Sequence, residues 1–206
     1  MTHSAPQPAP EPAPHTGPPR WLAWSTRYTD HVAEVCTTPA GRADLASGHS
    51  LRALAEPWRM LPHVRTRIPR HAGDTKIAYL AVAAMYAAYA PNPATVRQDD
   101  VTTWNPAHGD FGWSLALAVQ RGVLREESAT ELLKDLARKR ELPALIRRLQ
   151  PVVRRLADAG VPLSWPRLLN HLVRWPRYRT DIADQWMYSH YAPTTIPDGE
   201  AEESAA

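Results

Sequence analysis

Arginines recur at helical spacing in the C-terminal half of the sequence, and their guanidinium groups are suited to forked contacts with phosphate. Arg147 and Arg154 are seven residues apart, as are Arg148 and Arg155. Seven residues make about two turns of helix, so each pair lies on one side of the helix with roughly 10 Å between its members. This spacing predicts a row of positive charges that can bind the backbone of a nucleic acid.

The positive charge of the chain is concentrated in one region. The 206-residue sequence has a formal net charge of only +3, yet residues 138–179 contain eleven arginines and lysines and only two acids, Glu141 and Asp158. Because surface helices that serve solubility usually mix both signs, we interpret these nearly acid-free helices as a surface that binds phosphates and does not read bases. The predicted nucleic-acid-binding residues are Arg138, Lys139, Arg140, Arg147, Arg148, Arg154, Arg155, Arg167, Arg174, Arg177 and Arg179.

Residue types that serve catalysis or metal binding form no recognisable set. There are nine histidines but no H-E-x-x-H pair, and the phosphate-loop, dinucleotide-binding and G-x-S-x-G motifs are missing. His171 and His190 could meet in space, but solvated or structural roles are expected for both. The single cysteine, Cys36, excludes an internal disulfide and a cysteine zinc site, and we expect it to be a core residue in a reducing cytoplasm. We therefore predict no enzymatic activity, no catalytic or metal site, no cofactor and a cytoplasmic location.

The ends of the chain differ in composition from its body. Residues 1–19 contain seven prolines and are expected to form a disordered arm, and residues 196–206 are expected to form an acidic disordered tail. The arm lacks the basic and apolar regions of a signal peptide. No stretch approaches the roughly 18 uninterrupted apolar residues of a membrane span, so no membrane contact is expected. Residues 20–195 remain as the helical domain.

Apolar residues in that body recur every three or four positions, and no alternating strand pattern occurs. This periodicity predicts an all-α protein, a compact bundle of about eight helices that forms one unit or two packed halves. Residues 91–108 are expected to form the longest internal loop. The expected helices span residues 20–37, 41–58 with a break at Gly48, 74–90, 110–122, 128–140, 142–159, 164–175 and 179–192.

Capping residues set the expected ends of several helices. Asp74 or Thr75 should cap the helix that follows, and Ser128 with Glu131 matches a capping box. Glycine favours helix C-termini, so Gly122 and Gly160 should each end a helix. Two prolines are also informative. Pro151 should kink its helix, and Pro166 suits a first turn after an N-cap at Ser164.

The segment "SWPRLLNHLVRW", residues 164–175, combines an apolar side with arginines. At about 100° per residue, one side is apolar and the opposite side is polar. The expected apolar side consists of Trp165, Leu168, Leu169, Leu172 and Val173, and the expected polar side of Arg167, Asn170, His171 and Arg174. Trp165, Trp175 and Trp186 could stack on bases, but each falls on an apolar helical face or at its end, so core packing is the prediction.

Three segments of the C-terminal half occur in an order that resembles the small subunit (CasB family) of Cascade, the type I-E CRISPR surveillance complex. In that family a "gi-x-l-x-W" turn precedes an "LL-x-D-L-x-x-W" helix and a closing "W-x-x-x-(F/Y)-Y" helix. The matching segments here are Gly160–Trp165, Leu168–Trp175 and Trp186–Tyr191. The resemblance is closer over residues 110–192 than over residues 20–90.

This resemblance implies a non-catalytic helical protein that works inside a larger assembly. Its implied partners are the backbone and large subunits with their guide RNA, the target and non-target DNA strands, and a second copy of itself. In that setting it helps to hold open the R-loop, in which the guide pairs with one DNA strand and displaces the other.

The sequence departs from the family pattern at several positions. Glu131, Leu132 and Leu133 stand where Arg-Arg-Phe is common, and Leu45, Ala46 and Ser47 where Leu-Arg-Arg is common, so no DNA-binding role is carried over to them. Asn170 stands where an aspartate is usual.

A free-standing helical DNA-binding regulator is the alternative function. Such a protein needs polar base-reading side chains at the start of a recognition helix. The turn and helix in "GVPLSWPRLLNHL" offer Trp165 and Pro166 at that place, which are poor readers of base edges. A third reading, an enzyme of nucleotide metabolism, would need a pocket of acids and histidines that the sequence does not assemble.

Overall fold

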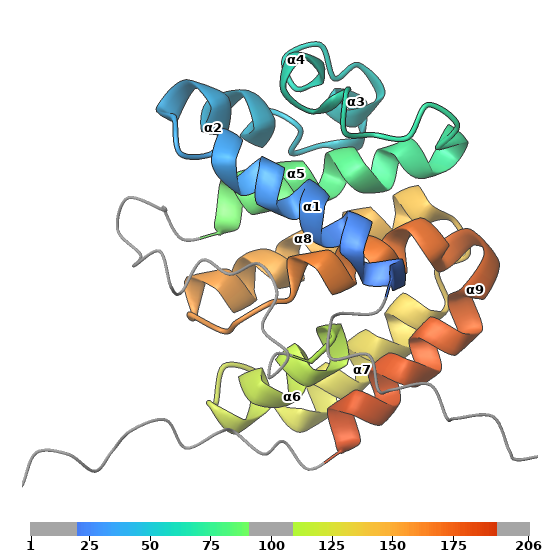
Figure 1. The fold of residues 1–206 in the computed structure, drawn as a ribbon. Coiled ribbons are helices and arrows are strands. Elements are labelled where there is room, and N and C mark those ends of the chain that lie inside the picture. The colour runs from blue at the N-terminus through green and yellow to red at the C-terminus, as the bar shows by residue number, and fades with distance from the viewer. Residues whose placement is uncertain (1–19, 91–108, 193–206) are drawn as a thin grey trace, which may run out of the picture.

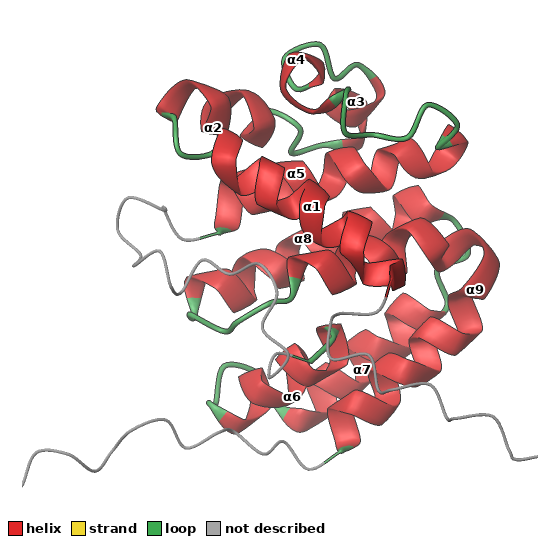
Figure 2. Cartoon of the chain, in the orientation of Figure 1, coloured by secondary structure: helices red, strands yellow, loops and turns green. Residues whose placement is uncertain are grey.

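The computed structural model describes residues 20–90 and 109–192 (Figure 1). These residues form helices and no strand (Figure 2), so the predicted all-α fold is confirmed. The arm 1–19, the loop 91–108 and the tail 196–206 lie outside the described residues. The elements are α1 (Arg20–Val35), α2 (Pro39–Ala46), α3 (Leu51–Ala55), α4 (Leu61–Val64), a 3-10 turn η1 (Gly73–Thr75), α5 (Lys76–Tyr89), α6 (Phe111–Gln120), α7 (Glu126–Ala137), α8 (Leu142–Asp158) and α9 (Trp165–Tyr191).

Helix α5 lies at the centre of the N-terminal part of the molecule. All ten residues from Ala78 to Ala87 are buried. Helices α1, α2, α8 and α9 all pack against α5, with α3 and η1 near its start (Figure 1). The alanines keep the helix narrow, so these neighbours can approach it from several sides at once.

The second group of helices gathers around α9. Helix α6 packs most extensively against α9, and α7 packs against both. At the closest approach, a Cβ atom built on Gly112 would lie 1.9 Å from the carbonyl oxygen of Trp186. Only glycine fits there without moving the backbone. The buried apolar side chains of both groups form one continuous cluster.

The three tryptophans of the C-terminal half are core residues, as predicted. Trp175 and Trp186 are buried, and their rings stack with centroids 5.3 Å apart. Trp165 packs edge-on against Tyr86 of α5. These indoles therefore pack the two halves of α9 against each other and α9 against α5, and they are not available to stack on bases.

Helix α9 replaces the two helices expected at 164–175 and 179–192. It is continuous but kinked at Tyr178, whose backbone angles (φ −124°, ψ 30°) are not helical. Pro176, two residues earlier, has no N–H to donate to the preceding turn, and this explains the break. The break in the sequence pattern was therefore read correctly, but the chain bends there and does not stop.

Two glycines end helices as predicted. Gly122 after α6 and Gly160 after α8 have positive φ values of 70° and 65°. After α8, the N–H of Gly160 donates to the carbonyl of Ala157 and that of Val161 to Leu156. This pair of bonds is the Schellman arrangement.

The capping box predicted at Ser128 was wrong. Helix α7 begins at Glu126, so Ser128 lies inside it and forms no capping box; Glu126 and Glu127 instead place negative charge at the positive end of the helix. Thr75, one of the two predicted alternatives, is the N-cap residue of α5, but its side chain makes no capping bond. Ser164 does precede α9, with Pro166 in the first turn, but its buried hydroxyl makes no capping bond. Helix α8 continues through Pro151.

Replacing Gly112 with alanine should lower the free energy of unfolding by about 1–3 kcal/mol, because the added methyl group forces α6 away from α9. Urea denaturation followed by circular dichroism measures this change. Gln120→Ala, at an exposed position of the same helix, is the control and should stay within about 0.5 kcal/mol of the unmodified protein. Equal stability of the two variants would contradict the close packing described for Gly112.

Candidate nucleic-acid interface

The four arginines of α8 are all exposed, on the side opposite its buried apolar residues. The expectation that this face lacks acidic partners is wrong for two of them. The Nε atom of Arg148 lies 2.7 Å from Asp135 of α7, and that of Arg154 lies 3.6 Å from Asp158 one turn later. Arg155 donates to the backbone carbonyl of Val123 at 2.6 Å. Among the described residues, Arg147 forms no ion pair.

Asp135 joins α7 to α8. Its carboxylate is 2.7 Å from both Lys139 and Arg148. The hydrogen bond from Lys139, followed by that from Arg148, lowers the pKa of Asp135 below its ordinary value. Lys139 and Arg148 are thus held by a structural contact, which leaves less of their charge free for a phosphate.

A second group of arginines lies at the kink of α9. The indole N–H of Trp175 donates to the backbone carbonyl of Lys139 at 2.9 Å, which places the turn between α7 and α8 beside the kink. The guanidinium carbons of Arg174 and Arg177 lie 4.8 and 5.6 Å from the ring centroid of Tyr178. The structure thereby brings together two segments of the predicted set through residues that are 36 positions apart in sequence. In the described part of the chain, Arg138, Arg140, Arg174, Arg177 and Arg179 form no ion pair.

Arg167 is separated from these exposed arginines. It is only partly exposed, and its Nε atom is buried without a hydrogen-bond partner. Its charge acts on Asp110, which caps α6 by accepting the N–H groups of Gly112 and Trp113. Ser189 also donates to the Asp110 carboxylate, yet burial raises the pKa of Asp110 above its ordinary value. Arg167 therefore faces an internal polar cluster at the start of α6.

Asn170 and His171 are buried, so the prediction that they lie on an exposed polar side of the helix was wrong. Helix α9 packs against α1, α5 and α6, and these two positions are covered, whereas Arg174 one turn later is exposed. The indole N–H of Trp186 donates to Nδ1 of His171 at 2.8 Å, which places the imidazole proton on Nε2. Burial, with smaller contributions from Arg174 and Arg167, lowers the pKa of His171 to about 3. His171 is a neutral core residue.

His190 and Cys36 are also buried within the fold. His190 is buried, with Nε2 3.0 Å from Glu126 of α7. Cys36 is a core residue as predicted, and burial raises the pKa of its thiol to about 11. Within residues 20–90 and 109–192, no three histidine, cysteine or acidic side chains are grouped to hold a metal ion. No helix of the described chain is both long enough and apolar enough to span a membrane.

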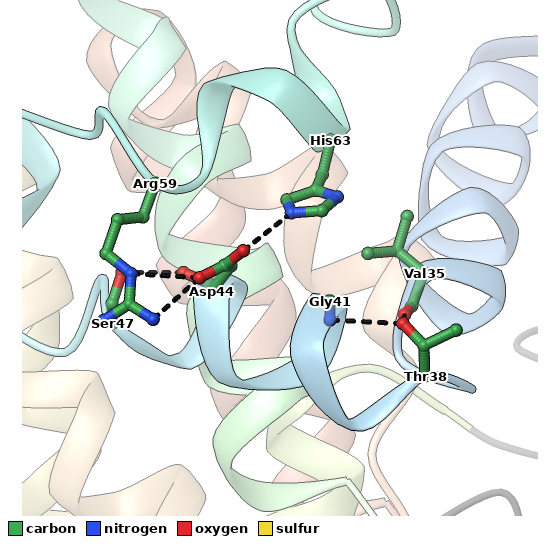
Figure 3. A network of polar contacts seen from close by, with 7 residues as sticks. All are labelled: Val35, Thr38, Gly41, Asp44, Ser47, Arg59 and His63. Carbon is green, nitrogen blue, oxygen red and sulfur yellow. Dashed lines mark hydrogen bonds and ion pairs between the residues drawn. The ribbon is translucent and has the colours of Figure 1, made fainter.

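One polar network in the N-terminal part was missed by the sequence analysis (Figure 3). Asp44 of α2 forms an ion pair with Arg59, whose Nη2 is 2.7 Å away, and accepts from His63 of α4 at 3.1 Å. These bonds lower the pKa of Asp44 below its ordinary value, and the hydrogen bond with His63 makes the largest contribution. The partners are 15 and 19 residues from Asp44, so no helical spacing could have revealed them.

These observations define an all-helical protein whose exposed arginines gather along α8 and at the kink of α9. The family of CRISPR-associated protein Cse2 matches residues 41–191, and the chain belongs to that family. This confirms the resemblance to a Cascade small subunit drawn from three short segments.

Three solved structures share this fold. A chain of a structure described as "CRISPR RNA-guided surveillance complex, pre-nicking" is 26% identical with a TM-score of 0.68, and a chain of a "CRISPR RNA-guided surveillance complex" is 24% identical with a TM-score of 0.65. The crystal structure of M. ruber CasB is 19% identical with a TM-score of 0.59. In each case the match covers 82% of this chain and 92% of the other. No curated protein matches the chain significantly.

The buried His171 predicts a dependence of stability on pH. Because its pKa is lowered from 6.5 to about 3, its contribution is complete above about pH 6.5 and is lost as the pH falls toward 3. Within that window the free energy of unfolding should fall by about 1.4 kcal/mol per pH unit from this residue. Urea denaturation at pH 7.5 and 5.5 measures the loss, and His171→Gln should show less of it. An identical acid loss in both proteins would contradict the assignment.

Proposed function

We propose that this protein is the non-catalytic small subunit of a type I-E CRISPR surveillance complex, Cascade, and that it stabilises the R-loop through contacts to DNA backbone that do not depend on sequence. Membership of the Cse2 family and a 26%-identical chain in a surveillance complex support the assembly. The observation that carries the DNA contact is the group of exposed arginines without ion pairs among the described residues. The proposed partners are the backbone and large subunits with guide RNA, both DNA strands and a second copy of this chain. The proposal includes no cofactor and a cytoplasmic location.

The energetics of R-loops make such a role effective. The guide–target duplex is about as stable as the DNA duplex that it replaces, so opening is nearly balanced. A few phosphate contacts that favour the open state then shift the balance measurably. Arginine suits this role because its fork can bind two phosphate oxygens and because it stays charged at any physiological pH.

The contacts within the structure rank the eleven predicted residues. Arg138, Arg140, Arg147, Arg174 and Arg177 are exposed and free of ion pairs in the described chain, and the proposal rests mainly on them. Arg154 has only a long contact to an exposed acid, so it remains available. The remaining five residues are less available to DNA. Lys139, Arg148 and Arg155 are held by contacts within the protein, and Arg167 and Arg179 are only partly exposed.

The alternative, a free-standing regulator, is less well supported. The first turn of α9 is the place where base-reading side chains would be needed, but Trp165 and Pro166 are both buried there. A buried first turn cannot enter a DNA groove.

The isolated protein should bind single-stranded DNA weakly, without sequence preference and with steep salt dependence. If four to six phosphates are engaged, the slope of log K against log salt concentration should be about −3 to −4. Fluorescence anisotropy with labelled oligonucleotides across a salt series measures it. A slope near zero, or strong preference for one duplex sequence, favours the regulator.

In the assembled complex, the double variant Arg147→Gln, Arg154→Gln should shorten the R-loop lifetime by about five- to tenfold. This follows if each exposed contact contributes about 0.5–0.7 kcal/mol, since 1.4 kcal/mol corresponds to a factor of ten. Arg27→Gln, an exposed arginine of α1, is the matched control and should have no effect. Native gels establish that each variant is incorporated. Equal lifetimes with full incorporation would refute the role of Arg147 and Arg154.

A further inference from the structure

Trp58 differs from the other tryptophans whose side chains the structure describes. Its side chain is 74% exposed, in the turn between α3 and α4, whereas Trp165, Trp175 and Trp186 are buried and Trp24 and Trp113 are partly buried against the core. An indole offers a large apolar surface, and leaving it in water forgoes the free energy that burial would give. The surface position of Trp58 therefore leaves a large apolar ring free to bind a partner.

The residues on both sides of Trp58 are held in place by the fold. Pro57 is buried, and Met60 is 1% exposed. The sulfur of Met60 packs so closely on Gly48 that a Cβ there would lie 2.5 Å from it. Arg59 is held by Asp44 of α2, as Figure 3 shows. The indole is thus presented outward by a backbone whose neighbours on each side are anchored.

The segment that contains Trp58 is strongly basic. Residues 49–76 contain six arginines and lysines and only two acids, Glu56 and Asp74. Four of the arginines are exposed and form no ion pair within the described chain: Arg52, Arg65, Arg67 and Arg70. This segment lies across α5 from α8 (Figure 1), so it is separate from the arginines of the C-terminal half.

We propose that Trp58 and these four arginines form a second DNA-binding surface, in which the indole stacks on a base of single-stranded DNA and the arginines contact the phosphates beside it. The inference rests on the proposed function and specifies how part of the displaced strand is held. Single-stranded DNA fits because its bases are accessible for stacking, and because an exposed aromatic ring in a segment with exposed, unpaired arginines offers the two interactions that such strands use. The arginines of α8 offer phosphate contacts alone, since the nearby tryptophans are in the core.

The test separates base contacts from phosphate contacts. Fluorescence anisotropy is measured with the full-length protein, a labelled 15-nucleotide oligothymidylate and an abasic strand of the same length. Trp58→Ala should weaken binding of the oligothymidylate by about five- to tenfold, in keeping with the loss of one stacked base, and leave binding of the abasic strand unchanged. Trp58→Phe keeps an aromatic ring and should retain most of the affinity.

Two further variants act as controls. The double variant Arg65→Gln, Arg67→Gln should weaken the binding of both strands equally, since these residues contact phosphate only. It should also make the dependence of log K on log salt concentration less steep. Tyr188→Ala removes an aromatic side chain that is 79% exposed on the last turns of α9 and should change neither affinity. Thermal unfolding verifies that each variant keeps its fold.

The possible outcomes distinguish this inference from the proposed function. If Trp58→Ala affects both strands equally, or neither, while the salt slope of the unmodified protein persists, stacking by Trp58 is refuted and the proposed function stands. If the unmodified protein binds neither strand, both fail. If Trp58→Ala blocks incorporation into the complex but leaves DNA binding unchanged, the residue contacts a protein subunit, and the inference is overturned.

Discussion

The burial of α5 is the constraint on which the rest of the structure depends. A helix that hides ten consecutive residues from water needs neighbours on every side, and four long or medium helices from distant parts of the chain supply them. Small alanine side chains make this possible because the surrounding backbones can come close. The surfaces that remain free are the outer sides of those neighbours. One arginine group lies there, on α8 and α9, and the other lies on the segment after α2.

The sequence pattern predicted much of the fold because its strongest signals are local. Helical periodicity and the glycines at positions 122 and 160 identified most helices and two of their ends. The short helix α4 was missed, because four residues carry too little periodicity to be recognised. The capping box at Ser128 failed because two glutamates further upstream start the helix instead.

The candidate site was predicted less completely, because its features depend on which helices meet. A polar side chain lies on the surface only where no other helix covers its position, and Asn170 and His171 are covered although Arg174, one turn later, is exposed. Likewise, the acid that pairs with Arg148 belongs to α7, thirteen residues earlier, so the row of arginines looked more isolated in sequence than it is. The exposure of Trp58 follows from the anchoring of Pro57 and Met60, which no spacing rule describes.

The position of α9 also determines the order in which the chain can fold. It is the last of the described helices, and it packs against α1, the first, as well as α5, α6, α7 and α8. During synthesis the earlier helices emerge before the helix that completes their core, so their apolar faces stay exposed until residues near 190 are made. Contacts between segments so far apart in sequence form late and slow the final step of folding. A chain cut before the kink at Tyr178 would lose Trp186, and with it the surface on which α6 rests.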